Sequence, residues 1–404
     1  MRESVFLHKT LEKSCPYIHK GQTNAIVKAC GGILNGGKLS ITSLGRSQPG
    51  TAKVKNKIKQ VDRVLGNGQI YQNIQQYYQA MAQYLLVPST YIEILVDWSS
   101  CANHKNHMLK ASIVKDSRSM TLYEEVHPEE KLANPKVHQQ FLERLKQIIP
   151  SDCEVNIITD AGFGITWFKL VTSLGWHFTG RVRNNKTYSQ DDGETWHRIS
   201  VLYPKATHRV QNFGEIILTK SEQLVCNLFL YREKVIVKQK YKRKVKSGRT
   251  ENVQRKSHKE PWLLACSLPE RLRKGKYIVK AYKKRMKIEH EFRDMKDSKW
   301  GIGLSETKTR DTQRLAILLL IGALTIFLLY LIGLIAEQNK WQHDYQANTV
   351  KSHRVLSLIF LGLQLIKHES EKINLNHLYN KMKELPHLFS ERKIDGVVKI
   401  CGDL

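Results

Sequence analysis

The spacing of apolar residues changes about ninety residues into the chain. Up to that point apolar positions recur every three or four residues, which is the period of amphipathic helices. The clearest example is the stretch 51–65, where a basic surface surrounds an apolar stripe of Val54, Ile58, Val61 and Leu65. A short piece, Ser40 to Arg46, stands before it and follows an earlier helical stretch, so the order is a helix, a tight connection and a basic helix. This order predicts a DNA reader of the helix-turn-helix kind, or alternatively a basic helix that only packs against its neighbours.

Beyond Tyr91 the apolar residues come in short β-branched runs, which predict strands. We expect three strands, a helix, a strand, a helix and a strand, over Tyr91 to Val96, Met108 to Val114, Ser119 to Glu125, Pro135 to Ile149, Val155 to Thr159, Phe163 to Leu174 and Trp176 to Val182. Three meandering strands followed by two crossover units is the ribonuclease-H-like order, in which the first and fourth strands are parallel neighbours. The predicted class is α/β: a ribonuclease-H-like mixed sheet with helices on both faces.

The composition shifts between Arg183 and Glu260. Short β-like pieces alternate there with polar turns, over Trp196 to Leu202, Glu215 to Thr219, Leu224 to Tyr231 and Val235 to Val237. A strongly basic stretch from Lys238 to Lys256 follows. This predicts an inserted β-rich module with a basic loop, or alternatively a disordered basic linker. A last strand, Trp262 to Leu268, and a long helix, Lys276 to Lys296, come after it, and the helix contains no Gly or Pro.

One apolar run, Leu315 to Ala336, is long enough to cross a bilayer. It carries no charge, and Thr325 and Tyr330 are its polar interruptions. A helix that is apolar on every side is also typical of the centre of a large soluble domain. The sequence holds one such run, close behind the helix that ends at Lys296, where an anionic membrane surface would hinder DNA. We therefore predict a buried core helix and no membrane.

These shifts predict five segments. They are a helical N-terminal DNA-binding domain (1–88), the first part of a catalytic core (89–182), the β-rich insertion (183–268), the second part of the core with the long helix and the apolar helix (269–370), and a helical tail (371–404).

The charge balance indicates a polyanionic partner. Lysine and arginine exceed aspartate and glutamate to give a net charge of +28 over 404 residues. A field of this sign gathers nucleic acid, because each phosphate contact releases counterions. We expect double-stranded DNA as the partner. The seven cysteines are scattered and form no C-x-x-C pair, so neither a zinc site nor a disulfide framework is indicated, and a reduced cytoplasmic protein is expected.

Two acidic residues follow directly on predicted strands that should be neighbours, Asp97 and Asp160. Ligands gather at the carboxyl ends of such strands, and two close carboxylates repel each other unless a cation neutralises them. Mg²⁺ takes oxygen ligands of this kind, and a pair of such ions can activate water and stabilise the leaving oxygen in phosphodiester cleavage. Taken alone, each aspartate is more typical of a turn.

Glu289 in the predicted helix is the candidate for a third ligand. Tyr282, Arg285 and Lys296 share its helix face at about 100° per residue. One carboxylate for a metal beside cations for phosphate suits phosphoryl transfer. The alternative is an ordinary surface helix in which Glu289 pairs with Arg285 or Arg293.

Here the motifs resemble those of a known family. The pattern Y-x2-R-x3-E-x6-K stands in YKKRMKIEHEFRDMK, and it is similar to the signature of the DDE transposases of bacterial insertion sequences, in the IS-four group that holds the Tn-ten and Tn-five transposases. ILVDWSS and IITDAGF resemble that group's two aspartate motifs, and TSLGRS followed by KNKIKQVDRVLGN resembles its N-terminal region. The resemblance covers about residues 5–365 and is closest to the Tn-ten type.

The resemblance implies that Asp97, Asp160 and Glu289 bind two Mg²⁺ ions, for which Mn²⁺ can substitute. It implies that Tyr282, Arg285 and Lys296 touch DNA phosphates, and the basic helix adds Lys57, Lys59 and Arg63 as expected DNA contacts. In this group a tryptophan on the last strand of the insertion stacks on a flipped base during hairpin formation. Trp262 stands at a similar position, with a buried strand tryptophan as the alternative.

The expected function is cut-and-paste transposition by a cytoplasmic, nucleoid-associated enzyme that self-associates in a synaptic complex with element ends and target DNA. Nicking by hydrolysis would free a 3′-hydroxyl, which forms a hairpin and later joins the target. The C-terminus is shorter than in the Tn-five type, which leaves dimerisation through a C-terminal helix open.

Three rival classes remain. A tyrosine recombinase would use a tyrosine nucleophile, for which the candidates are Tyr71, Tyr77, Tyr78 and Tyr84. A DNA-binding protein without catalysis would keep the charge but has no need of three acids in this layout. A membrane-anchored protein would use the apolar run.

Overall fold

The computed structural model describes residues 2–102, 105–115, 118–183, 185–234, 260–389, 393–394 and 397–398. The chain divides into two compact units. Unit 1 comprises Met1–Cys153, Met286–Arg392 and Ile400–Leu404, and unit 2 comprises Glu154–Arg285 and Lys393–Lys399. The predicted piece Val235 to Val237 and the basic stretch Lys238 to Lys256 lie outside the described residues.

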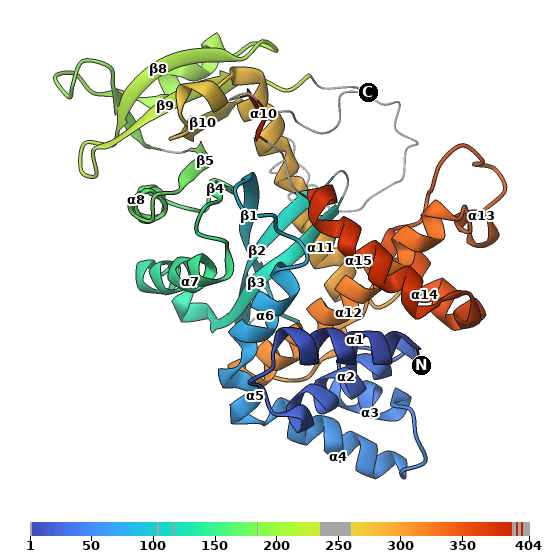
Figure 1. Cartoon of the computed structure of the whole chain (residues 1–404). Coiled ribbons are helices and arrows are strands. Elements are labelled where there is room, and N and C mark those ends of the chain that lie inside the picture. Colours follow the sequence, from blue (N-terminus) through green and yellow to red (C-terminus); the bar gives the residue numbers. More distant parts are fainter. Residues whose placement is uncertain are drawn as a thin grey trace, which may run out of the picture. The chain divides into compact units, whose positions relative to one another are not determined.

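The N-terminal part of unit 1 is helical, as predicted, and Figure 1 shows its helices gathered at one end of the unit. The helices are α1 (Arg2–Ser14), α2 (Lys20–Leu34), α3 (Ile41–Ser47), α4 (Val54–Leu65), α5 (Gly68–Gln72) and α6 (Ile74–Ala82). The side chain of Ser40 caps α3 by accepting from the Ser43 N–H. A Cβ on Gly45 would lie 2.5 Å from the Ile58 Cα, so this glycine lets α3 and α4 touch.

Three antiparallel strands form the sheet of unit 1, in the order β3-β2-β1. They are β1 (Tyr91–Ser100), β2 (Asn106–Lys115) and β3 (Arg118–Pro128). Helix α7 (Pro135–Ile148) packs on one face, where Phe141 meets Tyr123, and α11 (Met286–Lys296) covers the other, where Glu291 meets Lys110. Helices on both faces of this sheet agree with the predicted architecture.

Strand β1 is longer than predicted. It continues through Asp97 to Ser100, and its pairing with β2 runs to the Ser100–His107 pair. The last four residues of β1 are half-buried, so the apolar signal ends at Val96 while the backbone hydrogen bonds continue. Asp97 therefore lies within the strand and does not follow it.

Unit 2 holds a mixed sheet, which confirms the predicted α/β class. The parallel pair β4 (Glu154–Thr159) and β5 (His177–Val182) flanks the crossover helix α8 (Ile165–Ser173). Antiparallel strands continue from β5 in the order β10 (Trp262–Cys266), β9 (Leu224–Tyr231), β8 (Gln211–Leu218), β6 (Thr187–Ser189) and β7 (His197–Arg198). The short strands β11 (Lys393–Ile394) and β12 (Val397–Val398) pair with each other.

The prediction of a strand over Trp196 to Leu202 is wrong. Two of its residues form β7, and Ile199–Lys205 form a 3-10 helix that contains Pro204. Ile199 and Leu202 are three residues apart and both buried, which is the spacing of a 3-10 turn. Other 3-10 turns are η1 (Glu129–Lys131), η3 (Glu270–Leu272), η4 (Leu304–Glu306) and η5 (Ser370–Lys372).

The long helix predicted over Lys276 to Lys296 is interrupted. It comprises α10 (Gly275–Lys284) in unit 2 and α11 in unit 1, and Arg285 stands between them with αR dihedral angles. The N–H of Arg285 donates to the Tyr282 carbonyl three residues back, so the four-residue pattern of an α-helix is broken at this point.

The apolar run is a core helix of unit 1, as predicted. Helix α12 (Thr312–Gln338) has a mean hydropathy of 2.9 over its most apolar window, of which 94% is buried. It packs against β3, the N-terminal helices and the later helices α14 (Leu358–Glu369) and α15 (Leu375–Phe389). The Thr325 hydroxyl donates to the Ile321 carbonyl, which satisfies this buried polar group within the helix. The short helix α13 (Gln342–Tyr345) follows α12.

Candidate active site

Asp97 points to the face of the unit 1 sheet that α11 covers. In the antiparallel pair β1–β2, Asp97 stands directly opposite Lys110, and opposite residues point to the same face. The Lys110 ammonium contacts Glu291 of α11. Ser99, two residues further along β1, is also on this face, and its hydroxyl accepts a hydrogen bond of 2.7 Å from Lys296 of α11. Asp97 itself accepts a hydrogen bond from the Trp98 N–H.

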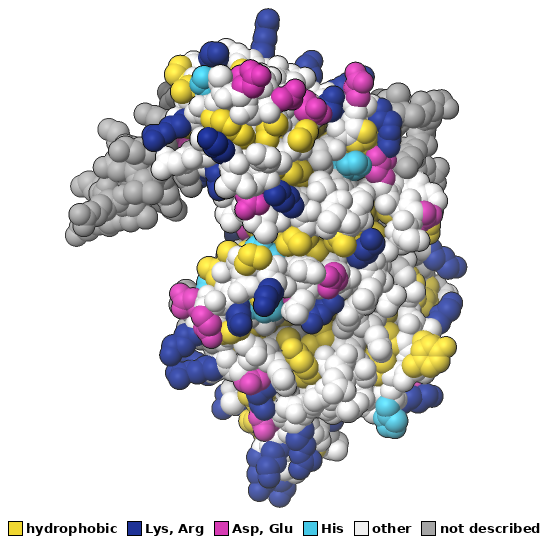
Figure 2. Space-filling model, turned by 90° about the vertical axis from the view of Figure 1, so that its left-hand side faces the viewer, with side chains coloured by type: hydrophobic (Ala, Val, Ile, Leu, Met, Phe, Trp, Pro, Cys, Tyr) yellow, Lys and Arg dark blue, Asp and Glu magenta, His cyan; other side chains and the backbone are white. Residues whose placement is uncertain are grey.

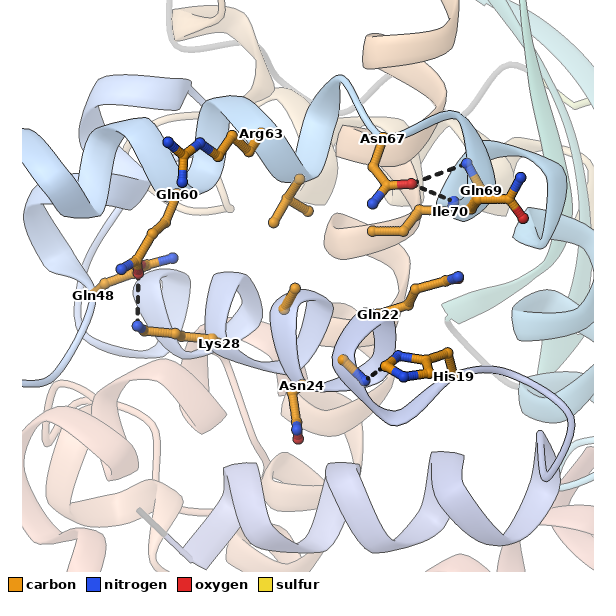
Figure 3. Close-up of a pocket in the computed structure, with 13 residues that line it drawn as sticks. His19, Gln22, Asn24, Lys28, Gln48, Gln60, Arg63, Asn67, Gln69 and Ile70 are labelled. Atoms are coloured by element: carbon orange, nitrogen blue, oxygen red, sulfur yellow. Dashed lines mark hydrogen bonds between the residues drawn. The ribbon is translucent and has the colours of Figure 1, made fainter.

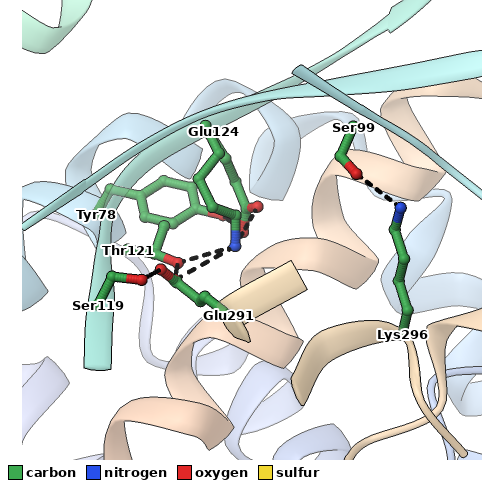
Figure 4. Close-up of polar contacts among 8 residues, drawn as sticks. Tyr78, Ser99, Ser119, Thr121, Glu124, Glu291 and Lys296 are labelled. Carbon is green, nitrogen blue, oxygen red and sulfur yellow. Dashed lines mark hydrogen bonds and ion pairs between the residues drawn. The ribbon is translucent and has the colours of Figure 1, made fainter. Parts of the chain in front are cut away.

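Glu289 is exposed on α11, two turns before Lys296 and on the same stripe of the helix. Figure 4 shows Lys296 extended toward Ser99 of β1. Lys296 is half-buried, and burial lowers its pKa. Two of the predicted site residues, Asp97 and Glu289, thus belong to facing elements of unit 1.

Asp160 belongs to unit 2 and follows β4 directly, as predicted. One of its carboxylate oxygens accepts a hydrogen bond of 2.7 Å from the Gly162 N–H, which fixes the turn after the strand. Among the described residues, no group of three or more His, Cys, Asp and Glu side chains is assembled as a metal cluster. The three acids are divided between the units: Asp97 and Glu289 in unit 1, Asp160 in unit 2.

Two further predicted contacts, Tyr282 and Trp262, meet in unit 2. Their rings lie edge to face with centroids 5.1 Å apart, and Tyr231 of β9 lies 5.7 Å from Trp262. The Lys283 ammonium lies over Trp262 at 6.0 Å. Tyr282 is buried and burial raises its pKa, whereas Trp262 is half-exposed at the start of β10. Trp262 is therefore the more accessible of the two rings, and Arg285 follows α10 directly.

The basic helix α4 presents its cations in more than one direction. Lys59 and Arg63 are exposed, whereas Lys57 is half-buried and donates to the Gln48 carbonyl. In Figure 2 the lower end of unit 1, which α4 and the connection before it form, carries a concentration of Lys and Arg side chains. Of the apolar stripe, Val61 and Leu65 are buried, but Val54 is 49% exposed, so the stripe covers only the second half of the helix.

A groove between α2 and α4 is lined in part by amide side chains, and Figure 3 shows Gln60 reaching across it toward Lys28. Lys28 and Arg63 contribute cations, and Lys28 donates to the Gln60 side chain at 2.7 Å. The amides come from Gln22, Asn24, Gln48, Gln60, Asn67 and Gln69, and the described residues that line the groove include no carboxylate. Amides and cations are the groups that contact bases and phosphates, so this face is compatible with DNA.

The structure speaks against a tyrosine nucleophile in the N-terminal helices. Tyr77 and Tyr78 are fully buried, and burial raises the pKa of both, to about 12 for Tyr77. The Tyr78 hydroxyl donates to Glu124, and the Tyr84 hydroxyl lies 2.8 Å from that of Ser14. A recombinase nucleophile must reach a DNA phosphate, which the buried hydroxyls of Tyr77 and Tyr78 cannot do.

The face of β1 opposite Asp97 is anchored by a pair that the sequence did not reveal. The Trp98 indole N–H donates to Nε2 of His138 on α7 over 3.1 Å, and His127 of β3 packs beside the indole. His138 is 4% exposed, and burial, with a smaller effect of His127, lowers its pKa to about 4. The neutral imidazole can accept this hydrogen bond, whereas the protonated form cannot.

The stability of the protein should fall as the pH is lowered from 6.5 to 4, because His138 is buried in its neutral form. The folded-state pKa of His138, about 4, lies below its ordinary value of 6.5, so the unfolded state takes up the proton first as the pH falls. As the pH falls from 6.5 to 4, titration of His138 should therefore reduce the free energy of unfolding by up to about 1.4 kcal/mol per pH unit. The measurement is urea unfolding of the wild type and of His138→Gln at about pH 7.5 and about pH 5.5, on either side of the ordinary histidine pKa. The variant keeps a hydrogen-bond acceptor but does not titrate, so its stability should change less between the two pH values. Equal pH dependence of the two proteins would contradict the prediction.

Residues 89–326, more than half of the chain, match a family model described as a transposase DDE domain. The match spans both aspartates and the glutamate, and it agrees with the ribonuclease-H-like class. No curated protein matches the chain.

Proposed function

Because the chain belongs to the transposases with a DDE domain, we propose that it performs cut-and-paste transposition of a bacterial insertion sequence, of the Tn-ten-like IS-four group, with Asp97, Asp160 and Glu289 as its metal ligands. Membership in the family makes it a DNA-transposing enzyme. The observation that supports the finer proposal is that the matched residues, 89–326, include all three acids, which stand in segments that resemble the DDE motifs.

The donor set suits a hard divalent cation. All three side chains are carboxylates, and Mg²⁺ prefers oxygen ligands. Asp97 and Asp160 are half-buried, and each uses one oxygen to accept a nearby backbone N–H, which fixes the carboxylate. A metal pair held by these residues would supply activation of water and stabilisation of the leaving oxygen.

The protein's part in the reaction is to hold and orient DNA. Water attacks the phosphorus at the element end, the P–O3′ bond breaks, and a 3′-hydroxyl and a 5′-phosphate result. That hydroxyl next attacks the opposite strand to give a hairpin and releases the flanking DNA. Arg285 and Lys296 would neutralise phosphates, with Tyr282 supporting Trp262, whose half-exposed ring is available to stack on a flipped base.

End recognition falls to the N-terminal helices in this proposal. Lys59 and Arg63 are exposed for phosphate contacts, and Lys57 supports the α3–α4 connection through its hydrogen bond to Gln48. Arg63 also lines the groove between α2 and α4, so the groove would contact the same DNA. Two copies would pair the element ends in a synaptic complex. The enzyme would act in the cytoplasm on nucleoid DNA, and the buried position of α12 fits this location.

The test is nicking of a duplex that carries the element's terminal repeat. With Mg²⁺ or Mn²⁺ the full chain should release a 3′-hydroxyl at the repeat boundary and then a hairpin, and EDTA should remove all cleavage because the carboxylates alone cannot activate water. A duplex with the repeat scrambled is the control and should stay intact. Denaturing gels give both products. Equal cleavage in EDTA, or of the scrambled duplex, would contradict the proposal.

A further inference from the structure

A fully buried polar cluster lies between α11 and the unit 1 sheet, and Figure 4 shows it. At its centre Lys110 of β2, 0% exposed, places its ammonium 3.0 Å from Glu124 and 3.4 Å from Glu291. Thr121 accepts from Lys110 and donates to Glu291, and Ser119 donates to Glu291 over 2.7 Å. We name these residues, with Tyr78, the Lys110 cluster.

A β-bulge brings Thr121 and Glu124 of β3 to one face. Ser112 of β2 pairs with Thr121, but its neighbour Ala111 pairs with Tyr123, so Leu122 is an extra residue in β3. Without it, Thr121 and Glu124, three residues apart, would point to opposite faces. With it, both reach Lys110, and Glu124 also accepts a hydrogen bond of 2.9 Å from Tyr78 of α6.

The Lys110 cluster connects to both unit 1 acids of the proposed site. Lys110 is the cross-strand partner of Asp97, and Glu291 lies two residues after Glu289 on the opposite side of α11. Two further bonds fix the later turns of α11: Asp294 accepts from Arg118 of β3 over 2.8 Å, and Lys296 donates to Ser99.

We propose that Glu291, through the Lys110 cluster, is the positioning residue that sets the roll and the height of α11 on the sheet, and so the placement of Glu289 relative to Asp97. This inference rests on the proposed function, since it takes both acids as metal ligands. Apolar packing holds the helix and the sheet together, but the hydrophobic effect is non-directional and specifies the rotation of the helix less sharply than polar contacts do. Hydrogen bonds from Ser119 and Thr121 do have direction.

The cluster's charges also support a role other than stability. Burying ions costs desolvation energy, and well-packed apolar residues often serve as well or better. Burial raises the pKa of Glu124 against the opposing effect of Lys110, while the two carboxylates raise the pKa of Lys110 against the effect of burial. Buried polar networks of this kind rigidify the elements that they join and specify one geometry.

Glu291→Met is the test, because Lys110 keeps its ion pair with Glu124 and no buried charge is left unpaired. Amide hydrogen exchange of residues 286–296 in the metal-free protein should become at least about tenfold faster, and Mn²⁺ binding, measured by electron paramagnetic resonance without DNA, should weaken about 10–100-fold. Glu291→Gln keeps the shape and an acceptor for Ser119 and Thr121, so it should restore both towards wild type.

The matched control is Leu142→Ala, a fully buried side chain of α7 on the other face of the sheet. It should lower the melting temperature without changing either readout in α11 or the metal site. If Glu291→Met fails to fold, the double variant Ser119→Ala with Thr121→Val removes the two hydroxyls that donate to Glu291 and should shift both readouts in the same direction. Wild-type exchange and wild-type Mn²⁺ binding in the folded variants would overturn the inference.

The experiment separates this inference from the proposed function. Asp97→Asn and Glu289→Gln should both weaken Mn²⁺ binding, with exchange in residues 286–296 unchanged. If they do and Glu291→Met does not, the positioning role is wrong and the metal site stands. If neither of them alters Mn²⁺ binding, the site assignment is wrong.

Discussion

Asp97→Asn, Asp160→Asn and Glu289→Gln should each reduce cleavage at the element end by about 10³-fold or more. Each change removes one negative charge from the metal ligands, and loss of metal assistance costs several kcal/mol in the transition state, where about 1.4 kcal/mol is tenfold in rate. The amides keep the local structure, because the side-chain oxygen of an amide in place of Asp97 or Asp160 can still accept the N–H of Trp98 or Gly162.

DNA binding separates a catalytic defect from a folding defect. The three variants should shift end DNA in a gel as wild type does, because the exposed cations of α4 are untouched. Glu130→Gln and Asp192→Asn also remove one charge each, at exposed positions, and should cut normally. Near-normal cleavage by any one of the three acid variants would remove that residue from the site.

Gly333→Ala and Gly362→Ala should each destabilise the protein by about 1–3 kcal/mol, although alanine favours helices by about 1 kcal/mol. The two glycines lie where α12 and α14 touch: a Cβ on Gly333 would stand 2.3 Å from the Leu358 carbonyl oxygen, and one on Gly362 would stand 2.5 Å from that of Leu329. Each clash is with backbone, so no rotamer change relieves it and the helices must separate.

Gly68→Ala is the matched control, since no atom of the described residues lies within 4 Å of the added Cβ at the start of α5. It should be neutral or stabilising. Urea unfolding of the three variants gives the comparison directly. A Gly333→Ala protein as stable as Gly68→Ala would mean that α12 and α14 do not approach as closely as described.

Local patterns predicted the central elements well because their ends coincide with changes in burial. Strand β4 and helix α7 match the prediction to within one residue at each end. Strand β1 does not, because its last residues are polar and only the backbone pairing continues. The interruption at Arg285 had no signal, since the sequence around it contains only residues that tolerate a helix.

The sequence contains one sign of the Lys110 cluster, a lysine on a buried strand face, which the spacing of apolar residues alone does not reveal. Lys110 stands in the predicted strand Met108 to Val114 at a position that alternation assigns to the same face as Ser112, and both are fully buried. A lysine on a buried face requires an acidic partner. The sequence offers many acids, and the bulge at Leu122, which has no glycine or proline to mark it, decides that Glu124 is one of them.

Because the chain is synthesised from its N-terminus, α12 is made before all of its packing partners are present. The N-terminal helices and β3 leave the ribosome before α12, so one side of this helix finds its partners at once. The side that holds Gly333 is covered only when α14 has been made. Until then the nascent chain presents an uncovered apolar stripe, the condition under which a growing polypeptide aggregates or is mistaken for a membrane anchor. Packing of α14 against α12 therefore also ends the exposure of this apolar stripe.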